Sequence, residues 1–172
     1  MKHTRASVIK RVEAEYRALD RIVRTLVPAD FRRPAMREEA PIQFTAKDVL
    51  AHINAWKWRQ VRVVANDKVP LRPFEPPKTS AITDTNAGIY ARSHRTPAKT
   101  IVAEHRAAHR AMLKALRAAP AEYFAKQRSA QWPFDAVGHV EEHRRKHLEP
   151  LVAEKRRARE GSSRASAARG AS

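Results

Sequence analysis

Apolar residues recur at alternating steps of three and four near the start of the chain. This spacing puts one continuous apolar stripe on a helix, as in the packed seam of a helix bundle. We therefore predict a helix over residues 6–27, which Pro28 ends because proline cannot continue a helix. The stripe consists of Ile9, Val12, Tyr16, Leu19, Val23 and Leu26.

A second helix is predicted over residues 46–65. Thr45 can cap its start, and Asp48 can return a hydrogen bond to the cap three residues later, which makes a capping box. Residues one helical turn apart share a face, so we expect His52 and Trp56 to line the same side of this helix. The apolar face that accompanies them consists of Val49, Ile53 and Trp56.

Two more long helices are predicted in the second half of the chain. Thr96 is a candidate N-cap, Pro97 suits the first helical position, and the helix that follows runs to Ala118. A fourth helix is predicted over residues 134–157. Its apolar positions are Val137, Val140, Leu148 and Leu151.

Prolines and polar residues mark the connections between these helices. Residues 29–43 form a basic connection, and residues 66–80 hold four prolines, which exclude a helix or a central strand. We also predict a short helix over residues 84–94 and a link over residues 121–130. A long connection before the third long helix can carry the chain back across a bundle, so that the second and third helices need not be antiparallel.

The four periodic segments predict an all-α protein, a four-helix bundle. Its 172 residues suffice for one hydrophobic core. We assign residues 1–158 to the bundle domain and residues 159–172, which contain the low-complexity run GSSRASAARGAS, to a disordered basic tail. No apolar run of about 18 residues occurs, so no membrane span is predicted. The charged N-terminal segment is also not typical of a secretory signal.

Charge and cysteine content narrow the classes of function. The chain has 35 Lys and Arg against 18 Asp and Glu, a formal charge of +17. Such a field attracts polyanions, although an arginine-rich proteome explains it equally well. No sequence-reading nucleic-acid motif is present, so any binding of DNA or RNA is expected to be electrostatic and non-specific. The chain has no cysteine, which excludes disulfides and a cysteine nucleophile and fits a cytoplasmic protein.

Histidines are the strongest candidates for chemistry. His139 and His143 are four residues apart in the predicted fourth helix, so their imidazoles stack on one face. Together with His52 from a facing helix, they would make a three-histidine metal site with open coordination positions. The motif is short, and a solvated helix face or a core histidine bonded to a carbonyl gives the same pattern.

Other histidines compete for the same role. His147 extends the stack by another turn, and by helical phase His143 and His147 lie nearer the apolar centre than His139 does. His105 and His109 project near the middle of the apolar face of the third long helix. Helical phase therefore leaves the choice of metal ligands or pocket residues open.

Few other motifs bear on function. GxGxxG, GxxxxGK[ST], GxSxG and HExxH do not occur, which argues against nucleotide binding and the common hydrolase plans. Asp135, Glu141 and Glu142 are candidate acids or bases, with solvated helix charges as the plainer interpretation. Trp56, Trp58 and Tyr90 are candidate pocket walls. The plainer interpretation is core packing for Trp56 and a position at the rim for Trp58.

A family resemblance rests on these residues. The run TAKDVLAH, from Thr45 to His52 and followed by Trp56, resembles the second-helix signature of DinB/YfiT-like proteins, most of all their ClbS/DfsB branch. The resemblance spans residues 8–152. It includes the stretch around Asn86, Ile89 and Tyr90 and the HxxxH pair His139 and His143.

The resemblance implies a bundle of up-down-down-up topology in which His52, His139 and His143 bind a divalent metal such as zinc or nickel. Similar proteins include transferases that use a low-molecular-weight thiol, which suits a chain without cysteine. The ClbS/DfsB branch is associated with self-protection against a genotoxin by hydrolytic opening of an electrophilic cyclopropane. Three extra histidines and the basic tail depart from the family pattern and leave metal assignment and substrate open.

Two classes of function follow. The first is an enzyme, a metal-dependent hydrolase or thiol transferase that acts on a small electrophilic or genotoxic molecule and serves stress or toxin resistance. The second is a non-enzymatic basic protein that binds nucleic acid non-specifically. Histidine spacing favours the enzyme, and the charge of +17 favours the binder. The substrate, the metal and the oligomeric state, a homodimer included, cannot be read from the sequence.

Overall fold

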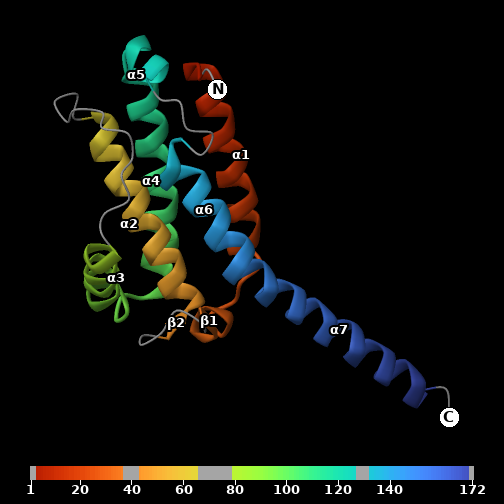
Figure 1. The fold of residues 1–172 in the computed structure, drawn as a ribbon. Helices are drawn as coiled ribbons and strands as arrows, with labels where there is room; N and C mark the ends of the chain where they lie inside the picture. The colour runs from red at the N-terminus through yellow and green to blue at the C-terminus, as the bar shows by residue number, and fades with distance from the viewer. Residues whose placement is uncertain (1–2, 37–42, 66–78, 127–131, 171–172) are drawn as a thin grey trace.

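The computed structural model describes residues 3–36, 43–65, 79–126 and 132–170. The protein is all-α, as predicted, and its long helices pack side by side as a bundle (Figure 1). Helices α1 and α6 run in one direction and α2 and α4 run in the other, which is up-down-down-up topology. The four helices are α1 (Arg5–Val23), α2 (Ala46–Ala65), α4 (Ala98–Ala118) and α6 (Gly138–His143).

Contacts at the helix ends fix these directions. Lys47, at the start of α2, donates from Nζ to the carbonyls of Ser93 and His94 just before α4, at 3.0 and 2.5 Å. These two helices therefore begin at the same end of the bundle. Arg5, at the start of α1, donates to the carbonyl of Ala119 after the end of α4 at 2.6 Å, so α1 runs opposite to α4.

Helix α1 starts at a capping box and ends earlier than predicted. The Ser7 N–H donates to Thr4 Oγ1 at 3.1 Å, and the Thr4 N–H donates to Ser7 Oγ at 3.0 Å. The helix stops at Val23 rather than at residue 27. The Asp30 carboxylate accepts from the Val27 N–H at 2.9 Å and holds the chain in a turn instead of another helical turn.

The connection before α2 contains structure that the sequence did not predict. The 3-10 turn η1 (Asp30–Arg32) leads into strand β1 (Pro34–Met36), which pairs antiparallel with β2 (Phe44–Thr45). Met36 and Phe44 face each other in the register and are both buried in the core. Strands of three and two residues are too short to show a period of two in the sequence.

Helix α2 begins as its capping box predicts. The N–H and Oγ1 of Thr45 both donate to Asp48 Oδ2, at 3.0 and 2.6 Å. The Asp48 N–H donates back to Thr45 Oγ1 at 3.3 Å. The cap fixes the first turn of the helix and therefore the rotation of the next turn, which carries His52.

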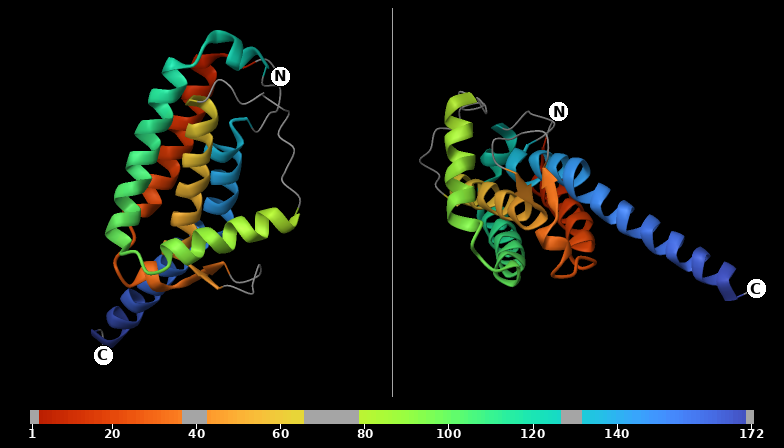
Figure 2. Two further views of the ribbon diagram at one scale, coloured as in Figure 1. Left: turned by 90° about the vertical axis from the view of Figure 1, so that its left-hand side faces the viewer. Right: turned by 90° about the horizontal axis from the view of Figure 1, so that it is seen from below.

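The segment before α4 differs in detail from the prediction. Helix α3 (Thr79–Ser93) is longer than the helix predicted over residues 84–94 and lies across the side of the bundle against α2 (Figure 2). Thr96 is not the N-cap of α4, because its Oγ1 donates to the Arg92 carbonyl at 3.5 Å. Pro97 occupies the cap position, without a side-chain hydrogen bond.

Two further connections complete the comparison. Helix α5 (Ala121–Lys126) occupies part of the predicted link after α4. Its Tyr123 and Phe124 are buried and pack on Trp132, with ring centroids at 5.2 and 5.8 Å. Of the proline-rich connection predicted over residues 66–80, residues 66–78 lie outside the described residues. Thr79 and Ser80 begin α3, so the prediction of no helix was wrong for these two residues.

The predicted fourth helix is divided into pieces. The 3-10 turn η2 (Phe134–Ala136) precedes α6, and the π-helical turn η3 (Arg144–Leu148) separates α6 from α7 (Glu149–Gly170). In the π-turn the Glu149 N–H donates to the Arg144 carbonyl, five residues back. A π-turn holds one residue more than an α-turn, so it turns everything after it back by about 100°.

Helix α7 projects from the bundle in every view (Figures 1 and 2). It continues to Gly170, so the disordered tail predicted from residue 159 is not what the structure shows over its described part. The run holds Ala165, Ala167 and Ala168, and alanine has the highest helix propensity. Among the described helices, none is long and apolar enough to cross a membrane.

Candidate metal centre

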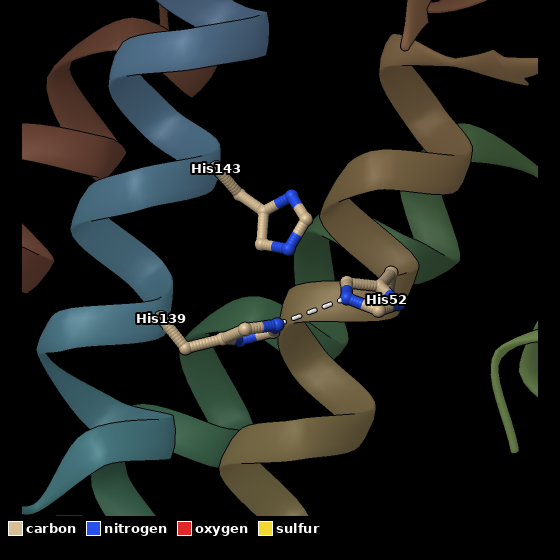
Figure 3. Close-up of side chains that lie close together, drawn as sticks. All are labelled: His52, His139 and His143. Carbon is tan, nitrogen blue, oxygen red and sulfur yellow. Dashed lines mark hydrogen bonds between the residues drawn. The ribbon is translucent and has the colours of Figure 1, made fainter. Parts of the chain in front are cut away.

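Three buried histidines converge between α2 and α6. His52 extends from α2, and His139 and His143 extend towards it from successive turns of α6 (Figure 3). The ring centroid of His52 lies 4.9 Å from that of His139 and 4.6 Å from that of His143. The ring centroids of His139 and His143 are 4.4 Å apart. His52 Nε2 and His139 Nε2 are 3.0 Å apart and share a hydrogen bond. The three histidines predicted as one set therefore lie together.

Burial favours the uncharged form of two of these imidazoles, His52 and His139. The exposed fractions are 2% for His52 and 9% for His139. Loss of hydration, together with repulsion from the nearby His143 and His147, lowers the pKa of His52 to about 3. The same loss, with repulsion from His143 and His52, lowers the pKa of His139 to about 2. Both rings are neutral at pH 7, which is the form that binds a metal.

The donor set fits a divalent cation. One ligand nitrogen from each of His52, His139 and His143 lies within 4.8 Å of the others. A tetrahedral zinc ion with bonds of about 2.0–2.1 Å holds its nitrogen ligands about 3.3 Å apart, so a small closure would complete the set. Three imidazoles leave a coordination position open, which is typical of catalytic zinc.

The rings lack part of the support that bound histidines usually have. The Nδ1 atoms of His52 and His139 are buried, and neither has a hydrogen-bond partner in the described part of the chain. Metal-bound imidazoles mostly donate this second N–H to a carboxylate or a carbonyl. Packing, rather than hydrogen bonding at Nδ1, therefore orients these two rings.

Aromatic side chains supply that packing. The Trp56 ring lies 5.6 Å from His139 and 6.2 Å from His52, centroid to centroid. Phe134 lies 5.7 Å from His139, and Phe44 lies 6.1 Å from His52. These rings keep water from the histidines, and electrostatic interactions are stronger where water is excluded.

Of the predicted walls, Trp56 packs on the histidines, whereas Tyr90 lies behind Phe44. Tyr90 stacks on Phe44 at 5.3 Å and on His94 at 4.9 Å. The Trp56 Nε1–H donates to Asn86 Oδ1 at 3.3 Å, which fixes the indole. Helix α3 therefore contributes to the site indirectly, through the groups that line it.

An ion pair between buried Asp135 and partly exposed Arg59 adjoins the aromatic wall. Asp135 is 0% exposed, so the interpretation of this residue as a solvated helix charge was wrong. Burial raises the pKa of Asp135 to about 6, although Arg59 opposes the rise from 2.7 Å away. The Arg59 guanidinium also lies 5.4 Å over the Trp56 ring. Sequence reasoning missed Arg59, whose only signal was its place one turn after Trp56.

The rival histidines of α4 lie elsewhere. His105 is 0% exposed, and its Nε2 is 3.6 Å from Asp20 Oδ1 on α1. The rings of His105 and His109 stack on Tyr16 at 4.9 and 3.6 Å. Burial lowers the pKa of His105 to about 2 and that of His109 to about 4. These two residues join a polar cluster with α1 and do not converge with His52.

The remaining alternative, His147, stays next to the site. Its ring is 5.3 Å from that of His143, and it is 5% exposed. Among the described residues, the converging donor group contains His143 and not His147. Glu141 and Glu142 are not buried with these histidines, and Glu141 pairs with the exposed Arg145 at 2.9 Å.

Comparison with known proteins places the fold. No family model and no curated protein sequence matches the chain. The solved structures that share its fold include the colibactin self-resistance protein ClbS in complex with a dsDNA. The two align with a TM-score of 0.68 and 12% identity over 91% of this chain and 98% of ClbS. An uncharacterised protein from Escherichia coli UTI89 aligns with a TM-score of 0.62 and 12% identity over 96% of both chains. The chain therefore has the fold of ClbS, as the sequence resemblance implied.

Proposed function

We propose that this protein is a metal-dependent enzyme that opens or conjugates a small electrophilic molecule. The observation that carries the proposal is the convergence of three buried imidazoles from two helices. The fold shared with ClbS, a colibactin self-resistance protein, supports an electrophilic toxin as the class of substrate. Resistance to such a toxin is the role that this activity would serve.

His52, His139 and His143 would hold the metal. A divalent cation in a three-histidine set supplies a bound water of lowered pKa or an anchor for a low-molecular-weight thiol. The chain has no cysteine, so a thiol nucleophile would come from solution. Hydrolysis of a cyclopropane adds a hydroxyl to one ring carbon and a proton to the other as their bond breaks.

The chain's own groups supply the rest of the chemistry. Trp56 and Phe134 offer flat apolar walls and keep bulk water out. Asp135 is the candidate base, because its pKa of about 6 lets it take up a proton near neutral pH. Its Oδ2 accepts from Arg59, whereas its Oδ1 has no hydrogen-bond partner in the described part of the chain.

The test is turnover of an electrophilic cyclopropane by zinc- or nickel-loaded protein, followed by mass spectrometry with and without a small thiol. A gain of one water identifies the hydrolase, and a thiol adduct identifies the transferase. His52→Ala should abolish either product, whereas Glu142→Ala, at an exposed position on α6, should retain it. Failure of the loaded wild-type protein to form either product would contradict the proposal.

A second candidate function is non-specific binding of nucleic acid. The formal charge of +17 favours it, and the similar structure of ClbS was solved with a dsDNA. Arg156 and Arg157, on the projecting α7, are exposed cations of the kind that contact phosphates. This function needs none of the three histidines, so variants separate it from the enzyme activity.

A further inference from the structure

Glu15 and Arg144 form a buried pair that joins α1 to the first residue of the π-turn. Arg144 Nε donates to Glu15 Oε1 at 2.6 Å, and its second terminal nitrogen donates to Oε2 at 3.0 Å. The residues are only 7% and 8% exposed. A two-bond contact of this kind fixes the plane of the guanidinium as well as its distance.

Stability alone does not account for such a pair. Moving two charges out of water costs hydration free energy, and the attraction between the charges only roughly offsets that cost. Proteins in which apolar residues of similar volume replace such a pair are often as stable. The best attested use of a buried polar pair is to select one arrangement of packed elements over others. Here the pair would select the π-turn that follows His143 over a continuous α-helix.

The π-turn decides which residues share the inner face of this segment. On a straight α-helix, Leu148 would lie about 180° around the axis from His139. The extra residue of the π-turn turns Leu148 back by about 100°. Leu148 is 1% exposed and packs in the core cluster that includes Ile53 of α2. The histidines and the apolar anchor can therefore face the interior together.

Arg144 is the residue at which α6 ends and the π-turn begins. It follows His143 directly, and its carbonyl accepts the π-type hydrogen bond from the Glu149 N–H. Its side chain also donates to the Glu149 carboxylate, while Glu15 holds the other edge of the guanidinium from α1. The backbone and the side chain of Arg144 are thus both fixed at the turn.

We propose that the Glu15–Arg144 pair is a positioning device for the histidine site. It holds the π-turn in place and so sets how His143 meets His52. The purpose of this device rests on the proposed metal function. Its mechanism rests on the contacts of α1, α6 and the π-turn alone.

The test replaces Arg144 rather than Glu15. Glu15 also faces the buried Lys57, whose pKa burial lowers to about 8 while Glu15 and Asp20 oppose the fall. A Glu15 variant would therefore also change the electrostatic environment of Lys57. Arg144→Met removes the guanidinium, and Arg144→Lys keeps the charge but cannot make the two-bond contact.

Arg145→Met is the matched control. Arg145 lies on the same π-turn, and its pair with Glu141 at 2.9 Å is solvent-exposed, with side chains 66% and 39% accessible. Crystal structures of the full chain would report the turn and the distance between the rings of His52 and His143, now 4.6 Å. Zinc titration by calorimetry would report affinity, with circular dichroism to show that each variant folds.

Both Arg144 variants should lose the π-type hydrogen bond and move His143 away from His52. Zinc affinity should fall about 10- to 100-fold, the usual effect of losing a group that orients a ligand. Arg145→Met should match the wild type in both readouts. If Arg144→Met does not fold, Arg144→Lys, which keeps the buried charge, gives the same comparison.

The two readouts separate this inference from the function on which it rests. An unchanged π-turn and His143 in a folded Arg144 variant overturn the inference, whether or not zinc binds. Unchanged zinc affinity in a variant of a zinc-binding wild type also overturns it. A wild type that binds no divalent metal overturns the proposed function, and the crystal structures then decide the inference.

Discussion

The histidines of this site differ from surface histidines in what surrounds each ring. His52 is walled by Trp56 and Phe44, and His139 by Trp56 and Phe134. A charged imidazole in such surroundings loses its hydration and gains no carboxylate in return, so the neutral form is favoured. Each ring can then offer a lone pair at neutral pH without first releasing a proton.

This electrostatic cost predicts acid sensitivity of the metal-free protein. The unfolded chain binds protons at its histidines near pH 6.5, whereas the pKa is about 3 for folded His52 and about 2 for folded His139. Below pH 6.5 the unfolded state therefore holds more protons, and the free energy of unfolding falls as the pH falls. At about pH 5 each histidine should remove about 2 kcal/mol.

Urea unfolding of metal-free protein at neutral pH and at about pH 5 measures this effect. His52→Gln and His139→Gln should each show a smaller loss of stability on acidification than the wild type, because the glutamine does not titrate. A wild-type free energy of unfolding that is the same at both pH values would show that the rings are not held neutral.

Asp135 predicts the pH dependence of catalysis. Its ionised form accepts the proton, so activity should rise as the pH passes upward through its pKa of about 6. Asp135→Asn should lower kcat by about 100-fold or more and remove that limb of the profile. Zinc affinity measured in parallel should stay unchanged. A profile through pH 6 that is the same in both proteins would exclude Asp135 as the base.

At the scale of elements, α2 is the part whose start and face follow directly from local sequence. The Thr45–Asp48 box forms with all three of its hydrogen bonds. Thr45→Ala should lower the free energy of unfolding by about 1 kcal/mol, whereas Thr45→Ser should largely retain it. Chemical denaturation of the three proteins measures the difference, and equal stability of Thr45→Ala and the wild type would show that the cap contributes nothing.

The same local signals explain which histidines of the site could be predicted from the sequence. The capping box and the helical spacing of apolar residues predicted the face of α2 on which His52 lies. The four-residue spacing predicted that His139 and His143 share one face of their helix. The choice among His139, His143 and His147 stayed open because phase was counted along a straight helix. The π-turn at Arg144 breaks that count. Its first residue, Arg144, bonds to Glu15 of α1, 129 residues away in sequence, and no local pattern reveals that contact.

Two other predictions differ from the structure because a different contact forms in place of the expected one. Thr96 could cap α4, but its hydroxyl bonds to the Arg92 carbonyl instead. His105 and His109 project inward as expected, but the helix that they meet is α1, with Tyr16. The packing of the whole bundle decides which inward helix faces meet, and the periodicity of one helix cannot predict this.

At the scale of the whole molecule, the dominant property is a formal charge of +17. Binding to duplex DNA, if driven by this charge, should weaken steeply between about 50 and 200 mM salt. Removing residues 161–172 deletes Arg164 and Arg169 and no acid. The slope of log affinity against log salt should then fall by at most about 2, because each phosphate contact contributes about 0.9.

Fluorescence anisotropy with duplexes of unrelated sequence measures both effects. Full-length protein and the truncated form should each bind all duplexes alike at a given salt concentration. A preference for one sequence that persists at high salt would contradict an electrostatic mode of binding. His52→Ala should bind DNA as the wild type does, since the histidine site takes no part in this contact.

The central claim, that three histidines hold a metal, is tested most directly by metal content. Elemental analysis of protein purified without an affinity tag should find about one divalent metal ion per chain, the capacity of a single three-histidine site. His52→Ala and His143→Ala should lose it, and His105→Ala, which alters the other buried histidine cluster, should retain it. Wild-type protein that holds no metal after incubation with zinc or nickel, or His52→Ala and His143→Ala that hold as much as the wild type, would contradict the account.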